Sequence, residues 1–284
     1  MKTIIVPIDF SRESLNGLDF ALMLAGKNRA NVQMVNIVVK NENTTTKSLE
    51  KDRKLAEGKF QEILQICRDK GNLKCTMTSK ILEGKIYTEI AALTDEYDDS
   101  MVVLSTHGES GFEELFIGGN AYRIISHSRK PVIAVRKNII PKTIKKIVLP
   151  LDITPETREK VPYTTHLAKL FNAEIHIITV CKSKSKTIAN KLNQYALQVA
   201  SSLDANNVAY KINHFIGDNP TDLTLDYARS IDADLISIMT EQEKSASNLL
   251  LGSYAHQMIN KSWIPVLLFP AFSLGKSTGF SSIG

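Results

Sequence analysis

Glycines that could bring the backbone close to an anion are concentrated between residues 101 and 135. This stretch begins with an apolar run, continues through a loop with Gly108 and Gly111, reaches the pair Gly118 and Gly119, and ends in a second apolar run. The pattern predicts a strand, a loop, a helix and a strand, with the loop at the carboxyl end of the first strand, where open α/β sheets bind ligands. Unpaired N–H groups and the positive end of the helix dipole would lie at the glycine pair, so we expect a phosphate there.

Other candidate chemistry in the chain has less support. We interpret His107 as a loop histidine, because no nucleophile and carboxylate are spaced around it to form a triad. The remaining histidines lack the spacing of metal ligands. Residues 275–278, GKST, imitate the end of a P-loop, but Pro270 stands where that motif requires a glycine. The sequence therefore favours a binding protein that is not an enzyme and holds no metal.

Hydrophobic periodicity predicts the strands and helices that position this loop. The run from Lys2 to Phe10 is long enough for a strand buried on both faces, and Ser11 follows it as a helix N-cap. Further strands are expected at 32–39, 74–82, from 101 and at 131–135, and further helices at 51–70, from 84 and from 119, with a polar loop at 41–48. This alternation predicts a doubly wound parallel sheet of five strands.

The whole pattern then occurs a second time. KTIIVPIDF at 2–10 returns as KKIVLPLDI at 145–153, an offset of 143, and LFIGGNAYRIISHSRKPVIAV at 115–135 returns as LLLGSYAHQMINKSWIPVLLF at 249–269, an offset of 134. Two copies of one domain explain both matches. We expect a first domain at 1–138, a second at 144–273, and a disordered Gly- and Ser-rich tail at 274–284.

Three features of the repeat lead to specific expectations. The two offsets differ by nine residues, and we assign the difference mostly to the loop 41–48, as an insertion in the first copy. Pro162 falls inside an expected helix that begins after Thr154 and Pro155, so we expect a kink or a late start there. The final strands of both copies are apolar at nearly every position, so we expect them to lie at the contact between the halves.

Composition limits the class of protein. A chain of 284 residues with 43% hydrophobic and 23% charged residues is normal for a globular protein of one or two domains. The net charge of +5 is spread thinly, so no nucleic-acid arm is expected. The apolar run near the N-terminus is too short for a signal peptide and no run is long enough to span a membrane, so we expect a cytoplasmic protein. Cys67, Cys75 and Cys181 lack metal or disulfide spacing and are expected to be reduced and mostly buried.

These features together resemble the universal stress protein family in its tandem form, over nearly the whole chain. The resemblance is carried by the P-x-D of the first strand, the G-x-x-x-x-x-I from Gly84 to Ile90, the glycine loop and the final K-P-V-x-x-V strand. It implies two tandem Rossmann-like domains of the adenine nucleotide alpha hydrolase-like type, packed as an internal pseudo-dimer.

In the ATP-binding members of that family the glycine run reads G-x-x-G, nine residues, then G-[S/T]. Gly108 and Gly118 fit this run, whereas Ser105 stands at the first glycine position and Gly119 at the Ser/Thr position. The first copy therefore keeps the loop in part.

The second copy keeps only the end of the same motif. Gly252 and Ser253 fit, but the two earlier glycine positions fall on Met239 and Gln242. The binding loop is therefore largely lost in the second copy.

The resemblance also implies roles for individual residues in the first domain. Asp9 would meet the ribose, and the backbone of Ile37 would meet the adenine edge. The phosphates would be surrounded by Gly108, Gly118, Gly119 and Asn120, with His107 close by and Ser105 at the start of the loop. On the residues alone, Asp9 also fits the role of a helix-start residue, and for Gly118 a close backbone approach is favoured over simple packing.

The sequence thus predicts a stress-responsive sensor that binds ATP or a related adenine nucleotide in its first domain. One alternative is a nucleotide-free interaction module of the same family, which Ser105 and Gly119 favour. The other is a slow ATP hydrolase, although no Walker lysine or metal-binding acidic pair accompanies the loop. The expected partners are the nucleotide and proteins that the sequence does not identify, without nucleic acid or membrane; a homodimer of the whole chain is the alternative to an internal pseudo-dimer alone.

Overall fold

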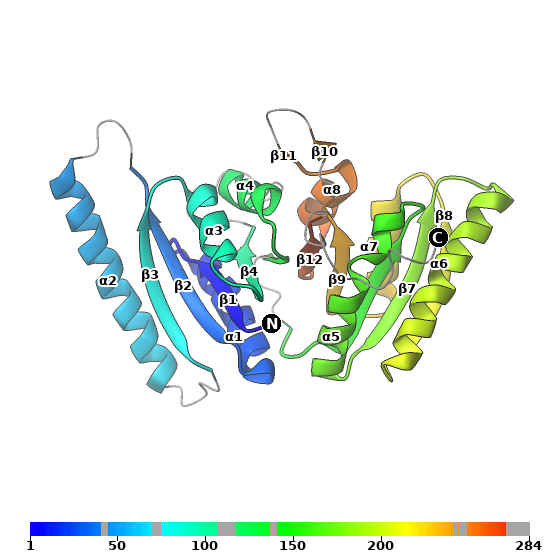
Figure 1. The fold of residues 1–284 in the computed structure, drawn as a ribbon, viewed down its shortest axis with the longest axis horizontal. Coiled ribbons are helices and arrows are strands. Elements are labelled where there is room, and N and C mark those ends of the chain that lie inside the picture. Colours follow the sequence, from blue (N-terminus) through cyan, green and yellow to red (C-terminus); the bar gives the residue numbers. More distant parts are fainter. Residues whose placement is uncertain are drawn as a thin grey trace. The chain divides into compact units, whose positions relative to one another are not determined.

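The computed structural model describes residues 1–40, 45–69, 75–106, 117–136, 141–240, 243–244 and 249–270. The chain divides into two compact units, Met1–Ile140 and Pro141–Gly284. Each unit alternates strands and helices along the chain (Figure 1). The tail expected at 274–284 lies outside the described residues.

The first unit is a five-stranded parallel sheet with helices on both faces. Its elements are β1 Thr3–Pro7, α1 Arg12–Asn28, β2 Asn31–Val38, α2 Thr46–Asp69, β3 Met77–Glu83, α3 Ile86–Asp95, β4 Ser100–Ser105, α4 Gly119–His127 and β5 Val132–Val135. The strand order is β3-β2-β1-β4-β5, and every pair is parallel. Right-handed crossovers place α1 and α2 on one face and α3 and α4 on the other, where α3 and α4 lie side by side (Figure 1).

The second unit repeats this sheet. Its elements are β6 Lys146–Leu151, a 3₁₀ turn Pro155–Arg158, α5 Val161–Phe171, β7 Glu174–Cys181, α6 Lys186–Ala205, β8 Tyr210–Ile216, α7 Pro220–Ser230, β9 Leu235–Met239, a short antiparallel pair β10 Glu243–Lys244 and β11 Leu249–Leu250, α8 Ser253–Lys261 and β12 Val266–Phe269. The order β8-β7-β6-β9-β12 corresponds strand for strand to the first unit. The prediction of two doubly wound repeats with one strand order is confirmed.

The central strands form because their side chains are apolar on both faces. In β1, Ile4, Ile5 and Val6 are all fully buried, and the central residues of β4 are equally buried. Parallel strands covered by helices on both sides require such continuous apolar runs. The polar residues that follow β1 and β4 are therefore held at one end of a rigid sheet.

The nine-residue difference between the repeats is distributed differently from our expectation. The predicted loop 41–48 is too long, because α2 already begins at Thr46. α2 has 24 residues and α6 has 20, so the helix itself accounts for part of the difference. The connections on either side of α2 supply the rest, because each has seven residues against four in the second unit. The first copy therefore differs by a longer β2–α2–β3 crossover and not by one inserted loop.

The late helix start at Pro162 is confirmed. Pro155–Arg158 forms a separate 3₁₀ turn, and α5 then begins at Val161 with Pro162 in its first turn. The missing N–H of a proline removes no helical hydrogen bond at that position.

The expected burial of the cysteines is wrong. Cys67, Cys75 and Cys181 are free thiols, but all three are only half-buried. Cys67 lies near the end of α2 and Cys181 is the last residue of β7, so neither is enclosed as the middle of a core element would be.

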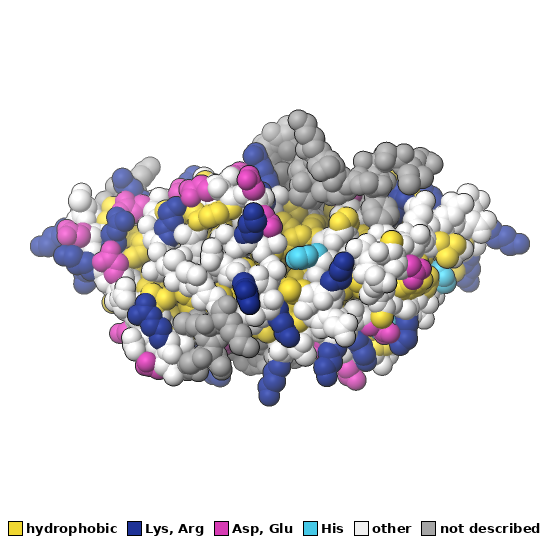
Figure 2. All heavy atoms as spheres, turned by 60° about the horizontal axis from the view of Figure 1, so that its bottom comes forward, with side chains coloured by type: hydrophobic (Ala, Val, Ile, Leu, Met, Phe, Trp, Pro, Cys, Tyr) yellow, Lys and Arg dark blue, Asp and Glu magenta, His cyan; other side chains and the backbone are white. Residues whose placement is uncertain are grey.

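Two surface properties bear on the classes of partner. No helix in the described part of the chain is long and apolar enough to cross a membrane. On the face shown in Figure 2, the Lys and Arg side chains are dispersed and interspersed with Asp and Glu. The net positive charge is therefore not gathered into one stripe on that face.

Candidate functional site

A cavity of about 310 Å³ lies at the carboxyl ends of the first unit's strands. Its wall comes from the ends of β1, β2 and β4 and from the first turns of α1, α3 and α4. The lining residues are Pro7, Ile8, Asp9, Ser14, Val35, Asn36, Ile37, Ile86, Leu104, Ser105, Thr106, Gly118, Gly119, Asn120, Ala121 and Ile124. The volume lies at the lower end of the range of about 300–1,000 Å³ that is typical of small-molecule sites.

The strand order explains why the cavity lies there. The chain moves outward from β1 to β2 and β3, and then returns to the other side of β1 with β4 and β5. The helices that follow β1 and β4 therefore leave on opposite faces of the sheet, and the two strands separate at their carboxyl ends. Open α/β sheets bind their ligands at this kind of switch point.

The structure brings together six of the eight residues that the sequence singled out. Their side chains or main chains line this one cavity: Asp9, Ile37, Ser105, Gly118, Gly119 and Asn120. The other two, His107 and Gly108, lie outside the described residues.

Asp9 starts the first helix and also lines the cavity. Its Oδ1 accepts hydrogen bonds from the amide of Ser11 at 3.0 Å and from the Ser11 hydroxyl at 2.5 Å. Ser11 in turn caps α1, because its Oγ accepts from the amide of Ser14 at 3.1 Å. The two interpretations of Asp9 are therefore compatible, since the cap holds the carboxylate in the cavity wall.

The turn after Asp9 has an unusual backbone. Phe10 has a φ of 67°, in the left-handed region that aromatic residues seldom adopt. Its ring packs edge-on against Phe60 with 5.1 Å between the centroids, and the Lys59 ammonium lies 4.9 Å from its centroid. These contacts stabilise a conformation that costs on the order of 1–3 kcal/mol. The position of Asp9 is thus fixed by its hydrogen bonds to Ser11 and by the packing of Phe10.

The glycine pair places the beginning of α4 at the cavity. Gly118 is the N-cap, and its amide donates to the carbonyl of Thr106 at 2.8 Å. A Cβ atom on Gly118 would lie 3.3 Å from that carbonyl oxygen, whereas one on Gly119 would meet no atom within 4 Å. The close approach therefore requires Gly118, and the helix N-terminus with its free amides and partial positive charge borders the cavity.

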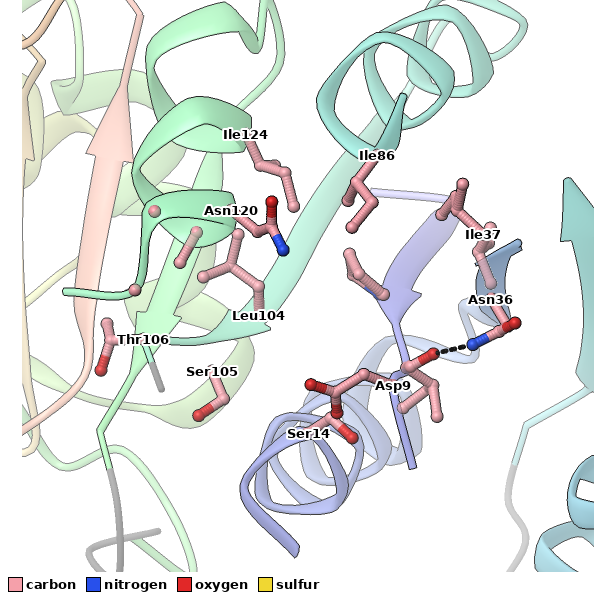
Figure 3. Close-up of a pocket in the computed structure, with 16 residues that line it drawn as sticks. Asp9, Ser14, Asn36, Ile37, Ile86, Leu104, Ser105, Thr106, Asn120 and Ile124 are labelled. Carbon is pink, nitrogen blue, oxygen red and sulfur yellow. Dashed lines mark hydrogen bonds between the residues drawn. The ribbon is translucent and has the colours of Figure 1, made fainter. Parts of the chain in front are cut away.

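The end of β2 supplies main-chain groups to the opposite wall. The side-chain amide of Asn36 donates to the Ile8 carbonyl at 2.7 Å, which ties the end of β1 to β2 (Figure 3). Val35 is the last β2 residue in register with β1. Because alternate residues of a parallel strand direct their peptide groups to opposite sides, Ile37 directs its N–H and C=O to the side where β1 has ended. Ile37 therefore offers one main-chain donor and one main-chain acceptor beside the cavity.

The cavity is apolar at one end and polar at the other. Ile37, Ile86 and Ile124 line one side, and the carboxylate of Asp9 and the hydroxyl of Ser14 lie on the other (Figure 3). A ligand with a flat apolar part and a polyhydroxy or anionic part fits this division.

The two halves of the chain each match one protein family. Residues 1–136 and residues 143–270 match the universal stress protein family. The chain belongs to that family. Universal stress protein MJ0531 of Methanocaldococcus jannaschii is 25% identical over 148 residues, which cover 48% of this chain and 82% of the relative. Universal stress protein Slr1230 of Synechocystis is 24% identical, over 61% of this chain and 58% of the relative.

The fold is shared with a solved structure over nearly the whole chain. The crystal structure of a universal stress protein from Archaeoglobus fulgidus superposes with a TM-score of 0.77, over 95% of this chain and 98% of that chain, at 17% identity. At this identity the likeness concerns the fold alone.

In this universal stress protein the second unit has a much smaller cavity at the equivalent place. Its volume is about 110 Å³, and its wall includes Asp152, Lys160, Met239 and Tyr254. The repeat aligns Met239 with Ser105 and Tyr254 with Asn120, so larger side chains fill space that is open in the first unit.

Lys160 fills further space in the second unit. It aligns with Gly17 of the first unit, and its side chain is 1% exposed. Its ammonium donates to the carbonyl and the hydroxyl of Thr157. Asp152 repeats the helix-start role of Asp9, because its Oδ1 accepts from the amide and hydroxyl of Thr154 at 2.7 and 2.5 Å. The contact of the aspartate with the residue two positions on is thus duplicated, whereas the side-chain cap made by Ser11 and the larger cavity are not.

Sequence analysis missed several lining residues of the first cavity. Asn36 gave a weak signal, as a polar residue within the apolar run of β2. Ser14 lies one helical turn after the Ser11 cap, and that spacing could have placed it at the same helix end. The apolar residues Ile86, Leu104 and Ile124 gave no separate signal, because core packing explains them equally well.

Proposed function

We propose that this universal stress protein binds an adenine nucleotide, ATP or a related one, in the cavity of its first unit. The observation that carries the proposal is the convergence of Asp9, the Ile37 peptide group and the Gly118 helix start on one cavity at the switch point of the sheet. Each group matches one part of a nucleotide: a carboxylate for the ribose hydroxyls, a peptide edge for the base, and a helix N-terminus for a phosphate.

In this proposal the protein acts by binding and not by catalysis. Among the described lining residues, Asp9 is the one group that could act as a general base, and its Oδ1 is already engaged by Ser11. The binding state would then be read by a protein partner, as in a stress-responsive sensor. Occupancy can signal because a ligand that binds only the folded unit stabilises it.

The alternative function is a nucleotide-free interaction module. Two observations favour it: Gly119 has no hydroxyl to donate to a phosphate, and the second cavity, with Lys160 and Tyr254 in its wall, has a volume of only about 110 Å³. A lost hydrogen bond to a charged group costs about 1.5–3 kcal/mol, which weakens binding roughly ten- to a hundredfold.

Mass spectrometry of small molecules released from the purified, denatured full chain tests the proposal against this alternative. The proposal predicts an adenine compound in the supernatant of the wild-type protein and a clear loss of it with Gly118→Val. Retention of equal amounts by Gly118→Val would place the ligand elsewhere, and recovery of no adenine compound together with no binding on titration would support the interaction module.

A further inference from the structure

The hydrogen-bond ladder between β1 and β2 stops one step earlier than its counterpart in the second unit. The last register pair of the first unit is Pro7 with Val35. In the second unit the strands β6 and β7 continue one pair beyond the aligned position, to Leu151 with Thr179. The two aligned pairs of strands therefore end differently at the edge of their cavities.

The alternation of the first ladder shows which bond would come next. At the start of the ladder the Asn31 amide donates to the Lys2 carbonyl at 2.8 Å. At its end the Ile8 amide donates to the Val35 carbonyl at 2.8 Å. The bonds of a parallel ladder are evenly spaced and alternate in direction between the strands. The next bond would therefore run from the Ile37 amide to the Ile8 carbonyl.

The side chain of Asn36 takes this acceptor instead. Its amide donates to the Ile8 carbonyl at 2.7 Å (Figure 3), and within the described residues no main-chain amide donates to the same carbonyl. In the second unit Thr179 stands at the position of Asn36, and its Oγ1 lies 2.8 Å from His214 Nδ1 on the neighbouring strand β8. The carbonyl of Leu151, which aligns with Ile8, is thus left to the main chain, and the ladder continues there.

The early end of the first ladder keeps the Ile37 peptide group available to a ligand. Ile37 lines the cavity, and its N–H and C=O are directed to the side where β1 has ended. A peptide group has one N–H donor, so an N–H bonded within a sheet cannot also serve a ligand. The counterpart of Ile37 is Val180, and the pair of Leu151 with Thr179 draws the Val180 peptide into the ladder. The two units thus show the same strand end with and without the asparagine.

We infer that Asn36 is a positioning residue for the base of the ligand: its side-chain amide occupies the Ile8 carbonyl and thereby reserves the Ile37 N–H for a ring nitrogen. The inference rests on the proposed function and adds the residue that prepares the contact with the base. Adenine carries a ring-nitrogen acceptor beside its amino group on each of two edges, so the Ile37 N–H can donate to one of them. Without the Asn36 amide, the Ile37 N–H would close on the Ile8 carbonyl, as the ladder of the second unit does.

Amide hydrogen exchange of the full chain, followed by NMR without ligand, tests the first step of this inference. The Ile37 amide should exchange at least about tenfold faster than the amide of Val35, which lies within the ladder. Asn36→Leu keeps the shape of the side chain and removes the donor, so it should slow exchange at Ile37. Thr179→Leu, at the aligned position of the second unit, should leave that rate unchanged. An Ile37 amide as slow as that of Val35 in the wild type would overturn the inference and leave the proposed function intact.

Calorimetric titration with AMP and with its 1-deaza and 7-deaza analogues tests the second step. Each analogue replaces one ring nitrogen by C–H, so the wild type should bind one of them about two- to tenfold more weakly than AMP, the range for one neutral hydrogen bond. Asn36→Leu should bring this ratio close to one, whereas Thr179→Leu should keep it. An equal loss of affinity for AMP and both analogues in Asn36→Leu would show a merely structural role and contradict the inference.

Two further outcomes are decided by the wild-type protein alone. If Asn36→Leu does not fold, AMP should still slow the exchange of the Ile37 amide in the wild type, and an unchanged rate at saturating AMP would refute the contact with the base. No binding of AMP at millimolar concentration would remove the proposed function itself, whatever the exchange rate of Ile37 without ligand.

Discussion

The amide of Gly118 donates to the carbonyl of Thr106 at 2.8 Å, and the amide of Gly252 donates to the carbonyl of Thr240 at 3.1 Å. In the first unit this bond ties the start of α4 to the residue after β4, and in the second unit it ties the start of α8 to the residue after β9. The bond is thus a property of the repeat, and it is present beside the larger and the smaller cavity alike. What distinguishes the first unit is the space in front of the helix.

The Ser11 cap is expected to contribute measurably to stability. Ser11→Ala removes the Oγ that accepts from the Ser14 amide at 3.1 Å and should lower the free energy of unfolding by about 1 kcal/mol. Chemical denaturation followed by circular dichroism measures the change. Ser185→Ala is the matched control, because Ser185 is the N-cap of α6 without a side-chain cap hydrogen bond. An equal loss for both variants would contradict the role of the Ser11 hydroxyl.

His176 should make stability depend on pH. It is 2% exposed, its Nδ1 lies 2.7 Å from the Tyr227 hydroxyl and its Nε2 lies 2.7 Å from Glu174 Oε1. Burial lowers the pKa of His176 from its ordinary value of 6.5, against the attraction of Glu174 and with added repulsion from Lys211 and Lys146.

A lowered pKa in the folded state has a definite sign. The unfolded chain binds the proton more readily, so the stabilisation by neutral His176 is present above pH 6.5 and is lost as the pH falls below that value. Denaturation between about pH 8 and pH 5 should show this loss, and His176→Gln should flatten it. His214→Gln is the control on the neighbouring strand β8. Stability that rises as the pH falls from 6.5, and does so only with His176 present, would contradict the assignment.

Lys160 is expected to be a structural cation. Lys160→Met keeps most of the apolar stem but leaves the Thr157 carbonyl without the ammonium donor, so we expect a loss of about 1–3 kcal/mol in unfolding free energy. Lys169→Met, on the exposed side of α5, should change it by less than about 0.5 kcal/mol. An unchanged free energy of unfolding in Lys160→Met would show that the Lys160 ammonium does not stabilise the second unit.

The final strand of each unit should make the separate halves associate. β5 and β12 are the last strands in their orders, and both are apolar throughout. An exposed apolar edge pairs readily with another chain. Residues 1–138 and 144–273 expressed alone should therefore form dimers or larger species in analytical ultracentrifugation. Monomeric halves at high concentration would contradict the expectation that these strands lie at the contact between the halves.

The architecture could be predicted from the sequence because the same pattern of apolar runs occurs in both copies. The helix cap at Ser11 and the late start of α5 at Pro162 could also be predicted, because each depends on the type of one residue and its neighbours. The site could be predicted only in part. Asp9 and Gly118 were found because turns and helix starts require particular residue types, whereas Ile86 and Ile124 line the cavity with side chains that any core would use.

Two features could not be predicted because they depend on packing. A lysine in a sequence is ordinarily expected to be exposed to solvent. Only the fold shows that Lys160 is buried, at the position that aligns with Gly17 of the first unit. The repeat difference was assigned to the loop 41–48 because that segment is polar, but α2 extends into it at Thr46. Polar composition alone does not separate a loop from the first turn of an exposed helix.

Calorimetry on two matched glycine variants tests the central claim most directly. Gly118 and Gly252 cap equivalent helices with equivalent bonds, so valine at either position should disturb folding similarly. The cavity beside α4 has a volume of about 310 Å³, whereas the one beside α8 has about 110 Å³. Titration with AMP and with ATP should give one site per chain in the wild type, no binding in Gly118→Val, and wild-type binding in Gly252→Val. Two sites per chain, or loss of binding in Gly252→Val with Gly118→Val unaffected, would contradict a single adenine-nucleotide site in the first unit.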